Sequence, residues 1–333
     1  YGFNNLDYLI DPISPLIICL TSYLIITFFN FLFTELERSK VRTAFSQYLA
    51  PEMVSRLAES SESLKLGGEK KNMTFLFSDI RGFTAISESY KSNPEDLTEL
   101  INNLLTVLSN EILDNDGTID KYMGDCIMAF WNAPTDQENH TDLALKASFD
   151  MEKALEEFNV EFQKQKGMEL KIGIGINTGE CIVGNMGSEK RFDYTVLGDP
   201  VNLASRLEGQ SGTYGFQRIL GQETVNALKS DSDLFELDLI QVKGKSEPVK
   251  IYTSFENFSL KGQKLTEFTQ DHDDFLKNYR NQQWDIALNF IQKWEQQVKE
   301  FDLYYAIFKD RIKDMKLNLT DPSWNGAYVA TTK

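Results

Sequence analysis

The chain has 333 residues, 41% of them hydrophobic and 25% charged, a composition typical of folded globular protein rather than of a disordered chain. Thirty-four Lys and Arg against 50 Asp and Glu give a net charge of −16, which disfavours a general electrostatic binding of nucleic acid phosphates. Two histidines and three widely spaced cysteines provide neither a structural zinc site nor a disulfide framework, so any metal chemistry is expected to use oxygen ligands.

Residues 12–34 (PISPLIICLTSYLIITFFNFLFT) carry no charged side chain. Their 23 positions would span roughly 34 Å as an α-helix, against a hydrocarbon core of about 30 Å. A buried core helix is the alternative, but the segment is apolar all round, so we predict a transmembrane helix within residues 1–34. Acidic residues precede the segment and Arg38, Lys40 and Arg42 follow it, which predicts a cell-membrane protein with residues 35–333 in the cytoplasm.

Residues 35–66 are predicted to form an amphipathic helical connector. Its apolar side chains recur at steps of three and four residues, with a break at Pro51, and Gly67 and Gly68 close it. A solvated spacer is the alternative, whereas an apolar face next to a membrane span favours pairing with a second copy. The chain begins at Tyr1 without an initiator Met, and we expect it to be part of a longer protein.

From residue 67 to about residue 256, short β-rich runs alternate with helical stretches near residues 94–113, 137–165 and 199–209. This alternation predicts a domain in which helices pack against a sheet. Residues 257–333 carry helical patterns and are predicted to form a tail of two antiparallel amphipathic helices. The β-rich runs are MTFLFSDI, IDKYMGDCIMAFW, LKIGIGINTG, CIVGNMG, FDYTVLG, LIQVKG and VKIYTSF.

Two aspartates lie where strands are predicted to end. Asp79 ends an apolar run, so a buried strand would deliver its carboxylate to the sheet end. Asp125 lies in KYMGDCIMAF, where Gly117 and Gly124 indicate a hairpin. Each Asp alone is more often a turn residue or a helix cap than a metal ligand. Together, two carboxylates at neighbouring strand ends suit Mg²⁺ that keeps positions open for substrate phosphates.

The segment NTGECIVGNMGSEKRFDYTVLGDPVNLASRLEG combines turn glycines, basic residues and a helix start at residues 199–200. Asn202 and Arg206 are four apart on that helix and share a face, where an amide and a guanidinium suit a sugar and a pentavalent phosphate. From spacing alone, a surface helix with a salt-bridging Arg is the alternative. Lys243 and Lys245 could reach phosphate, or could simply belong to a hairpin turn.

Four segments together resemble, in this order and at these separations, the catalytic domain of class III nucleotide cyclases: FSDIRGFT, KYMGDCIMAFW, GINTGECIVGNMGSEKRFDYTVLGDPVNLASRLE and VKGK. The resemblance implies an α+β fold over residues 67–256, with a ferredoxin-like βαββαβ core and extra strands. It implies an adenylate cyclase that converts ATP to 3′,5′-cyclic AMP and pyrophosphate. It further implies homodimers with shared active sites and two Mg²⁺ ions per site, for which Mn²⁺ can substitute.

The resemblance assigns roles by position. Asp79 and Asp125, with the carbonyl of Ile80, match the metal ligands, and Lys121 with Thr195 matches the pair that reads the purine. Guanylate-specific members look like Glu and Cys at these two positions. A lysine donates a hydrogen bond to adenine N1, whereas guanine N1 is itself a donor, so the resemblance implies ATP as substrate.

By the same resemblance, Asn202 matches the ribose-orienting amide, Arg206 the transition-state arginine and Lys245 the phosphate lysine. The metal ligands would come from one protomer and the other site residues from its partner. A Thr at position 195 resembles the subgroup that includes bicarbonate-responsive cyclases. The span and connector resemble the joint found in cyclases with an upstream CHASE-type sensor, and the tail resembles a tetratricopeptide-like hairpin, although one hairpin is not a repeat array.

Three other functions fit the sequence less well. A catalytically silent nucleotide-binding partner is disfavoured because every position that the family requires is filled, and a guanylate cyclase is disfavoured by Lys121 and Thr195. A phosphodiesterase would need clusters of His and Asp, for which two histidines are too few. The expected partners are therefore ATP, a second copy of the chain and membrane lipid, and no nucleic acid.

Overall fold

The computed structural model describes residues 13–45, 67–189, 191–230, 233–242, 247–254, 258–318, 321 and 324–329. The chain divides into two compact units, residues 1–64 and residues 65–333. Most of the predicted connector, including its break at Pro51, lies outside the described residues, and so does Lys245.

The described part of the first unit is the long helix α2 (Ile13–Phe45). Its stretch Ile13–Phe33 is long and apolar enough to cross a membrane by length and composition, and its side chains are exposed in the structure. The helix does not end at the predicted limit of the span but continues to Phe45. Residues 35–45 contain no Pro or Gly, so nothing in this stretch interrupts the backbone hydrogen bonds.

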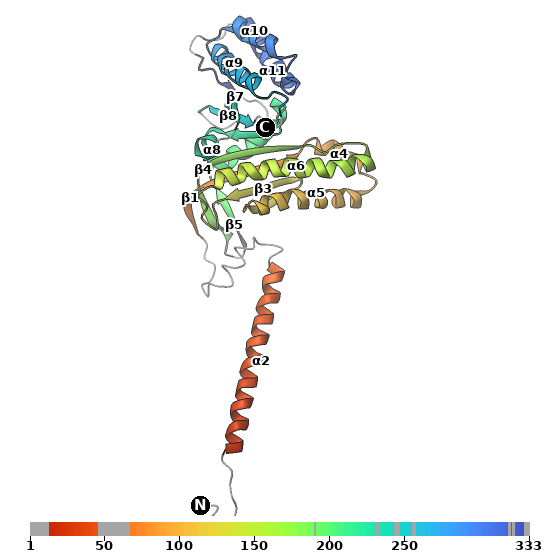
Figure 1. The fold of residues 1–333 in the computed structure, drawn as a ribbon, viewed down its shortest axis with the longest axis vertical. Helices are drawn as coiled ribbons and strands as arrows, with labels where there is room; N and C mark the ends of the chain where they lie inside the picture. Colours follow the sequence, from red (N-terminus) through yellow and green to blue (C-terminus); the bar gives the residue numbers. More distant parts are fainter. Residues whose placement is uncertain are drawn as a thin grey trace, which may run out of the picture. The chain divides into compact units, whose positions relative to one another are not determined.

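In the second unit, the described strands form one nine-stranded sheet in the order β2-β3-β1-β4-β6-β8-β7-β9, with β5 paired to β4 (Figure 1). The pairs β4–β6 and β7–β9 are parallel, and the others are antiparallel. The strands are β1 (Gly67–Ile80), β2 (Thr118–Met123), β3 (Cys126–Trp131), β4 (Ile172–Ser188), β5 (Arg191–Leu197), β6 (Arg218–Gly221), β7 (Leu234–Gln241), β8 (Val249–Ser254) and β9 (Tyr328–Val329).

Helices cover both faces of this sheet, and β1 is therefore buried on both sides. Leu76 and Ile80 face a core that they share with α5 and α6, whereas Phe75 and Phe77 face a second core that includes the start of α7. Figure 1 shows α5 and α6 side by side, in agreement with their many contacts. The helices of this part are α4 (Phe83–Ser89), α5 (Pro94–Asp114), α6 (His140–Lys166), α7 (Asp199–Tyr214) and α8 (Gln222–Ala227).

The predicted α+β fold is confirmed. The elements β1, α5, β2, β3, α6 and β4 follow one another as βαββαβ, and their strands lie in the order β2-β3-β1-β4 that defines the ferredoxin-like arrangement. Two details differ from the sequence expectation. Gly67 and Gly68 pair with Asn185 and Gly184 and so begin β1 rather than close a connector, and the two predicted strands around residue 180 are one long strand, β4.

The C-terminal tail is helical, but it is not the predicted pair of helices. Its first predicted helix is divided into α9 (Gln263–Arg280) and α10 (Trp284–Trp294), because the chain turns at Gln282, whose φ is +60°. The short η1 (Lys299–Phe301) and α11 (Asp302–Leu317) follow, and β9 then pairs in parallel with β7. Figure 1 shows these helices at the β7 and β8 end of the sheet, where they share one aromatic core with it.

Candidate active site

The end of β1 presents the first predicted metal ligands. Because side chains alternate along a strand, Asp79 lies on the same face as the buried Phe75 and Phe77. The backbone amide of Ile80 donates to Asp79 Oδ1 at 3.0 Å and also to Asp125 Oδ2 at 3.3 Å. The two predicted carboxylate ligands therefore converge on one peptide group.

Asp125 reaches this point from the tight turn between β2 and β3. Gly124 in that turn has a φ of +69°, a conformation that glycine adopts without a steric penalty. Since β3 runs antiparallel to β1 with Ile127 opposite Ser78, the turn lies level with the end of β1. Burial, together with a hydrogen bond and the negative charge of Asp79, raises the pKa of Asp125 to about 7.

This crowding fits a bound cation. Two carboxylates that share one amide donor repel each other, and a hard divalent ion would relieve the repulsion through oxygen ligands. Within the described ranges, no group of three or more His, Cys, Asp or Glu side chains forms a ready-made cage. A site with two carboxylates is what Mg²⁺ tolerates, since it keeps waters or substrate oxygens as its other ligands.

The predicted purine-reading residues, Lys121 on β2 and Thr195 on β5, are brought together by a third residue. Thr195 Oγ1 donates to Asp120 Oδ2 at 2.7 Å, and Lys121 Nζ lies 3.5 Å from Asp120 Oδ1. Asp120 was missed in the sequence analysis, although it directly precedes Lys121. The contact could not be read from the sequence, because 75 positions separate Asp120 from Thr195.

Helix α7 carries Asn202 and Arg206. It begins at Asp199 with proline in its first turn, as the sequence predicted, and Asn202 is exposed while Arg206 is half-buried. The Nη1 atom of Arg206 is buried and has no hydrogen-bond partner among the described residues. The helix lies directly on β4. The two backbones are so close that a Cβ at Gly175 would overlap the backbone of Ala204 and Glu208. Only glycine permits that approach.

The predicted site residues fall into separate groups within one chain. Asp79, Ile80 and Asp125 form one group, and Lys121 with Thr195 forms another. In the described part of the chain, no hydrogen bond or ion pair joins the two groups. Lys245 cannot be placed with either group, since it lies outside the described residues.

A further polar cluster lies behind the metal-ligand group and was not predicted. Arg81 follows Ile80 directly, and its Nη2 donates to the hydroxyl of Ser211 on α7, which in turn donates to the backbone carbonyl of Glu208. Burial and the negative charge of Asp79 raise the pKa of Glu208 to about 7, and the positive charge of Arg81 opposes this rise. The cluster thus connects the end of β1 to α7 within one chain.

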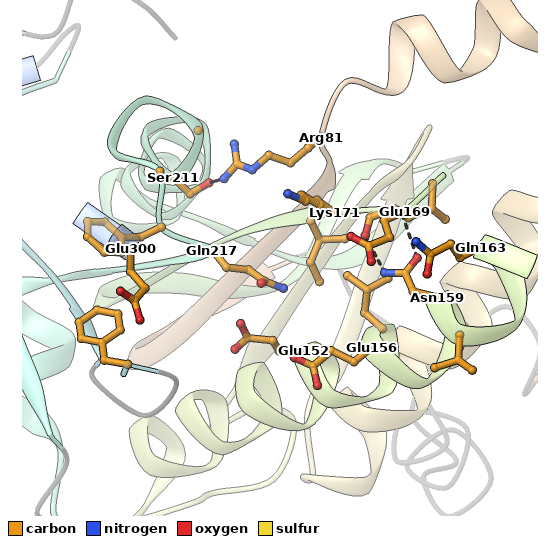
Figure 2. A pocket seen from close by; sticks show the side chains of 18 residues that line it. Arg81, Glu152, Glu156, Asn159, Gln163, Glu169, Lys171, Ser211, Gln217 and Glu300 are labelled. Atoms are coloured by element: carbon orange, nitrogen blue, oxygen red, sulfur yellow. Dashed lines mark hydrogen bonds between the residues drawn. The ribbon is translucent and has the colours of Figure 1, made fainter. Parts of the chain in front are cut away.

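Arg81 and Ser211 also line a cavity of about 740 Å³. Figure 2 shows Arg81 directed toward Ser211 on one side, with Glu152 and Glu156 of α6 on the other. The tail contributes Glu300 to the wall. None of the predicted site residues that the structure describes lines this cavity, so it is distinct from the candidate active site.

The fold and these groups define a class of protein. Residues 67–256 match the family described as the adenylate and guanylate cyclase catalytic domain. The match covers more than half of the 333 residues, and the chain therefore belongs to this family.

The curated relatives include adenylate cyclases. The chain is 36% identical over 223 residues to an adenylate cyclase of Anabaena cylindrica, which covers 64% of this chain and 43% of that protein. It is 33% identical over 209 residues to adenylate cyclase 1 of Rhizobium meliloti, which covers 62% of this chain and 31% of that protein. The chain thus spans less than half the length of these two relatives.

Solved structures of both substrate classes are similar to this chain. The adenylyl cyclase CyaB from P. aeruginosa is 38% identical with a TM-score of 0.53, and the alignment covers 59% of this chain and all of that one, 100%. A guanylyl cyclase is 36% identical with a TM-score of 0.51, covering 59% of this chain and 98% of the other. These likenesses establish the cyclase fold and leave the choice of nucleotide to the site residues.

Proposed function

We propose that this chain is an adenylate cyclase that converts ATP to 3′,5′-cyclic AMP and pyrophosphate. The observation that carries the proposal is the grouping of Lys121 and Thr195 around Asp120. The ammonium group of Lys121 can donate to N1 of adenine, whereas N1 of guanine carries a hydrogen and would oppose it. The similarity to two curated adenylate cyclases supports the same substrate.

Asp79, Asp125 and the carbonyl of Ile80 are the groups that would hold the metal, and we expect two Mg²⁺ ions per site, with Mn²⁺ as a substitute. Bound Mg²⁺ supplies Lewis-acid chemistry, in that it lowers the pKa of the ribose 3′-hydroxyl and neutralises charge on the triphosphate. The role of the two carboxylates would be to hold the positive charge of the metal at the reacting end of the nucleotide.

In the proposed reaction the 3′-oxygen attacks the α-phosphorus in line. The O3′–Pα bond forms, the bond from Pα to the leaving pyrophosphate oxygen breaks, and the hydroxyl proton passes to water. Asn202 would orient the ribose, and Arg206 would stabilise charge that develops on the α-phosphoryl oxygens. The buried Nη1 of Arg206 has no hydrogen-bond partner among the described residues, which supports a role in binding an anionic ligand. Lys245 would bind the phosphates.

A second copy of the chain is required by this proposal. Among the described residues of one chain, no hydrogen bond or ion pair joins the metal-ligand group to the purine-reading group, so we place them in two different sites of a homodimer. Each site would combine Asp79 and Asp125 of one protomer with Lys121, Thr195 and α7 of its partner. Small rotations between protomers would then change the rate steeply, because in-line attack tolerates little misalignment.

Helix α2 is proposed to anchor the enzyme in the cell membrane, with the cyclase domain and tail in the cytoplasm. Its stretch Ile13–Phe33 has the length and apolarity for a span, and the basic residues that follow it favour the cytoplasmic side. We further propose that residues 35–66 transmit rotation from the span to the dimer. Unchanged activity and dimerisation after removal of residues 1–66 would argue against that role.

A guanylate cyclase is the second candidate, because a guanylyl cyclase structure is nearly as similar as the adenylyl cyclase one. A silent nucleotide-binding module is the third. The three are separated by giving the full chain MgATP and MgGTP in competition and measuring cyclic AMP, cyclic GMP and pyrophosphate. Predominant cyclic AMP is the expected result. Predominant cyclic GMP would identify GTP as the substrate, and no product with Mg²⁺ or Mn²⁺ would favour the silent module.

A further inference from the structure

Asp120 is an almost completely buried carboxylate at the edge of the candidate purine site. Its side chain is 1% exposed, although that of the adjacent Lys121 is 41% exposed. It occupies a β-bulge, since the register of β2 against β3 shifts between Ile119 and Lys121. A bulge redirects a side chain that regular pairing would aim elsewhere, and here it directs Asp120 at the hydroxyl of Thr195.

The hydrogen bond between Thr195 and Asp120 has a chemical consequence. A hydroxyl carries one hydrogen, and the hydrogen of Thr195 is committed to Asp120 Oδ2 at 2.7 Å. An ionised carboxylate can only accept. Burial raises the pKa of Asp120, and the hydrogen bond from Thr195 and the Lys121 ammonium 3.5 Å from Oδ1 oppose this rise by stabilising the ionised form. Towards a ligand, the Thr195 oxygen can therefore only accept a hydrogen bond.

We propose that Asp120 is a specificity-determining positioning residue, which fixes Thr195 as a hydrogen-bond acceptor and thereby selects the 6-amino group of adenine over the 6-oxo group of guanine. This inference rests on the proposed function, because it assumes that Lys121 and Thr195 face the purine. Adenine offers a donor at position 6 and an acceptor at N1, which match an accepting Thr195 and a donating Lys121. Guanine reverses both.

The decisive variant is Asp120→Asn in the full chain. Its amide can donate to the Thr195 oxygen, which frees the hydroxyl to donate to a ligand. The probes are ATP, purine riboside 5′-triphosphate, which lacks only the 6-amino group, and inosine 5′-triphosphate, which carries a 6-oxo group. We expect the wild type to favour ATP over purine riboside triphosphate by about tenfold in kcat/KM, and Asp120→Asn to reduce this preference to about twofold or less.

Thr195→Val tests whether Asp120 acts through Thr195. This variant should lose the same preference, and Asp120→Asn should have no further effect on it, because one interaction cannot be lost twice. Asp193 is exposed and lies on the same strand, two residues from Thr195. Asp193→Asn is the matched control, because it removes the same charge as Asp120→Asn. It should retain the wild-type preference. Thermal unfolding of each variant verifies that it is folded.

Two results would overturn the inference. One is an unchanged preference for ATP over purine riboside triphosphate in Asp120→Asn; the other is a further loss when Asp120→Asn is added to Thr195→Val, which would place its action on Lys121. Absence of cyclic product from the wild type would instead count against the proposed function. In that case, binding of the 3′-deoxy forms of ATP and purine riboside triphosphate, which cannot cyclise, tests Asp120 by the same ratios.

Discussion

Arg311 on α11 and Asp238 on β7 form a buried ion pair between the tail and the sheet, with Nη1 and Oδ2 2.5 Å apart. The hydroxyl of Tyr214 donates to the same Oδ2 at 2.6 Å and accepts from Arg311 Nη2 at 3.0 Å. Tyr214 is the last residue of α7, the helix that carries Asn202 and Arg206. The tail therefore supports the end of a helix with two proposed catalytic residues.

Replacing Arg311 should destabilise the whole second unit. Arg311→Met leaves the Asp238 carboxylate buried without its cation, and the expected loss is about 3–5 kcal/mol in the free energy of unfolding. Urea unfolding measures this loss. Lys309→Met is the control, because it breaks an ion pair with Glu295 whose side chains are far more exposed, and it should cost less than about 1 kcal/mol. Equal small losses in both variants would contradict a supporting role for the tail.

The stability of the tail should fall in mild acid because of His272. This side chain is fully buried, its Nε2 lies 2.7 Å from the carbonyl oxygen of Glu236, and burial lowers its pKa to about 4. The unfolded chain takes up a proton on His272 near pH 6.5, and the folded chain does not. The free energy of unfolding is therefore unaffected by His272 above pH 6.5 and decreases from there toward pH 4.

The expected decrease from this group is about 2 kcal/mol between pH 7 and pH 5. It is obtained as the difference in pH dependence between wild type and His272→Gln, both measured by urea unfolding. Gln keeps a donor for the Glu236 carbonyl and has no proton to take up in this range. Parallel stability curves for the two proteins would exclude His272 as the source.

The sequence predicted those features that depend on local patterns. The apolar run before Asp79 defined β1, the glycine at 124 indicated the hairpin that holds Asp125, and the proline at 200 marked the start of α7. Features that depend on contacts between distant segments were missed. The four-residue β6 is too short for a periodic signal, and β9 exists through its pairing with β7, some 88 positions earlier.

The same distinction applies to the candidate site. The positions of Asp79 and Asp125 at predicted strand ends indicated a metal site, whereas Lys121 and Thr195 were assigned by resemblance. Asp120 was missed because its contact with Thr195 depends on a bulge in β2 and on a partner in β5, and neither is visible in a single stretch of sequence. The contact of Arg81 with α7 was missed for the same reason.

Shared sites predict complementation between two inactive variants. Asp79→Asn removes a metal ligand and Arg206→Ala removes the proposed transition-state group, and each homodimer should be inactive. When equal amounts are co-assembled, half of the dimers are mixed, and each mixed dimer has one intact site, so activity should recover to roughly 25% of the wild type. A mixture of Asp79→Asn with Asp125→Asn is the control and should stay inactive. Recovery in the control, or none in the test mixture, would refute the assignment of groups to protomers.

Removal of residues 1–66 should release the protein from membranes. The full chain is expected to sediment with vesicles and to resist extraction by alkaline carbonate, because burial of the apolar stretch Ile13–Phe33 stabilises insertion. Residues 67–333 should stay in the supernatant. If the full chain is equally soluble without detergent, α2 does not anchor the protein.

The central claim is that the carboxylates of Asp79 and Asp125 serve metal-dependent cyclisation of ATP. The most direct measurement is cyclic AMP formed from MgATP by the full chain, side by side with Asp79→Asn, Asp125→Asn and the exposed control Asp136→Asn. We predict cyclic AMP and pyrophosphate in equal amounts from the wild type and the control, at least about a hundredfold less from each site variant, and none with EDTA. Undiminished cyclic AMP from Asp79→Asn and Asp125→Asn would contradict the account.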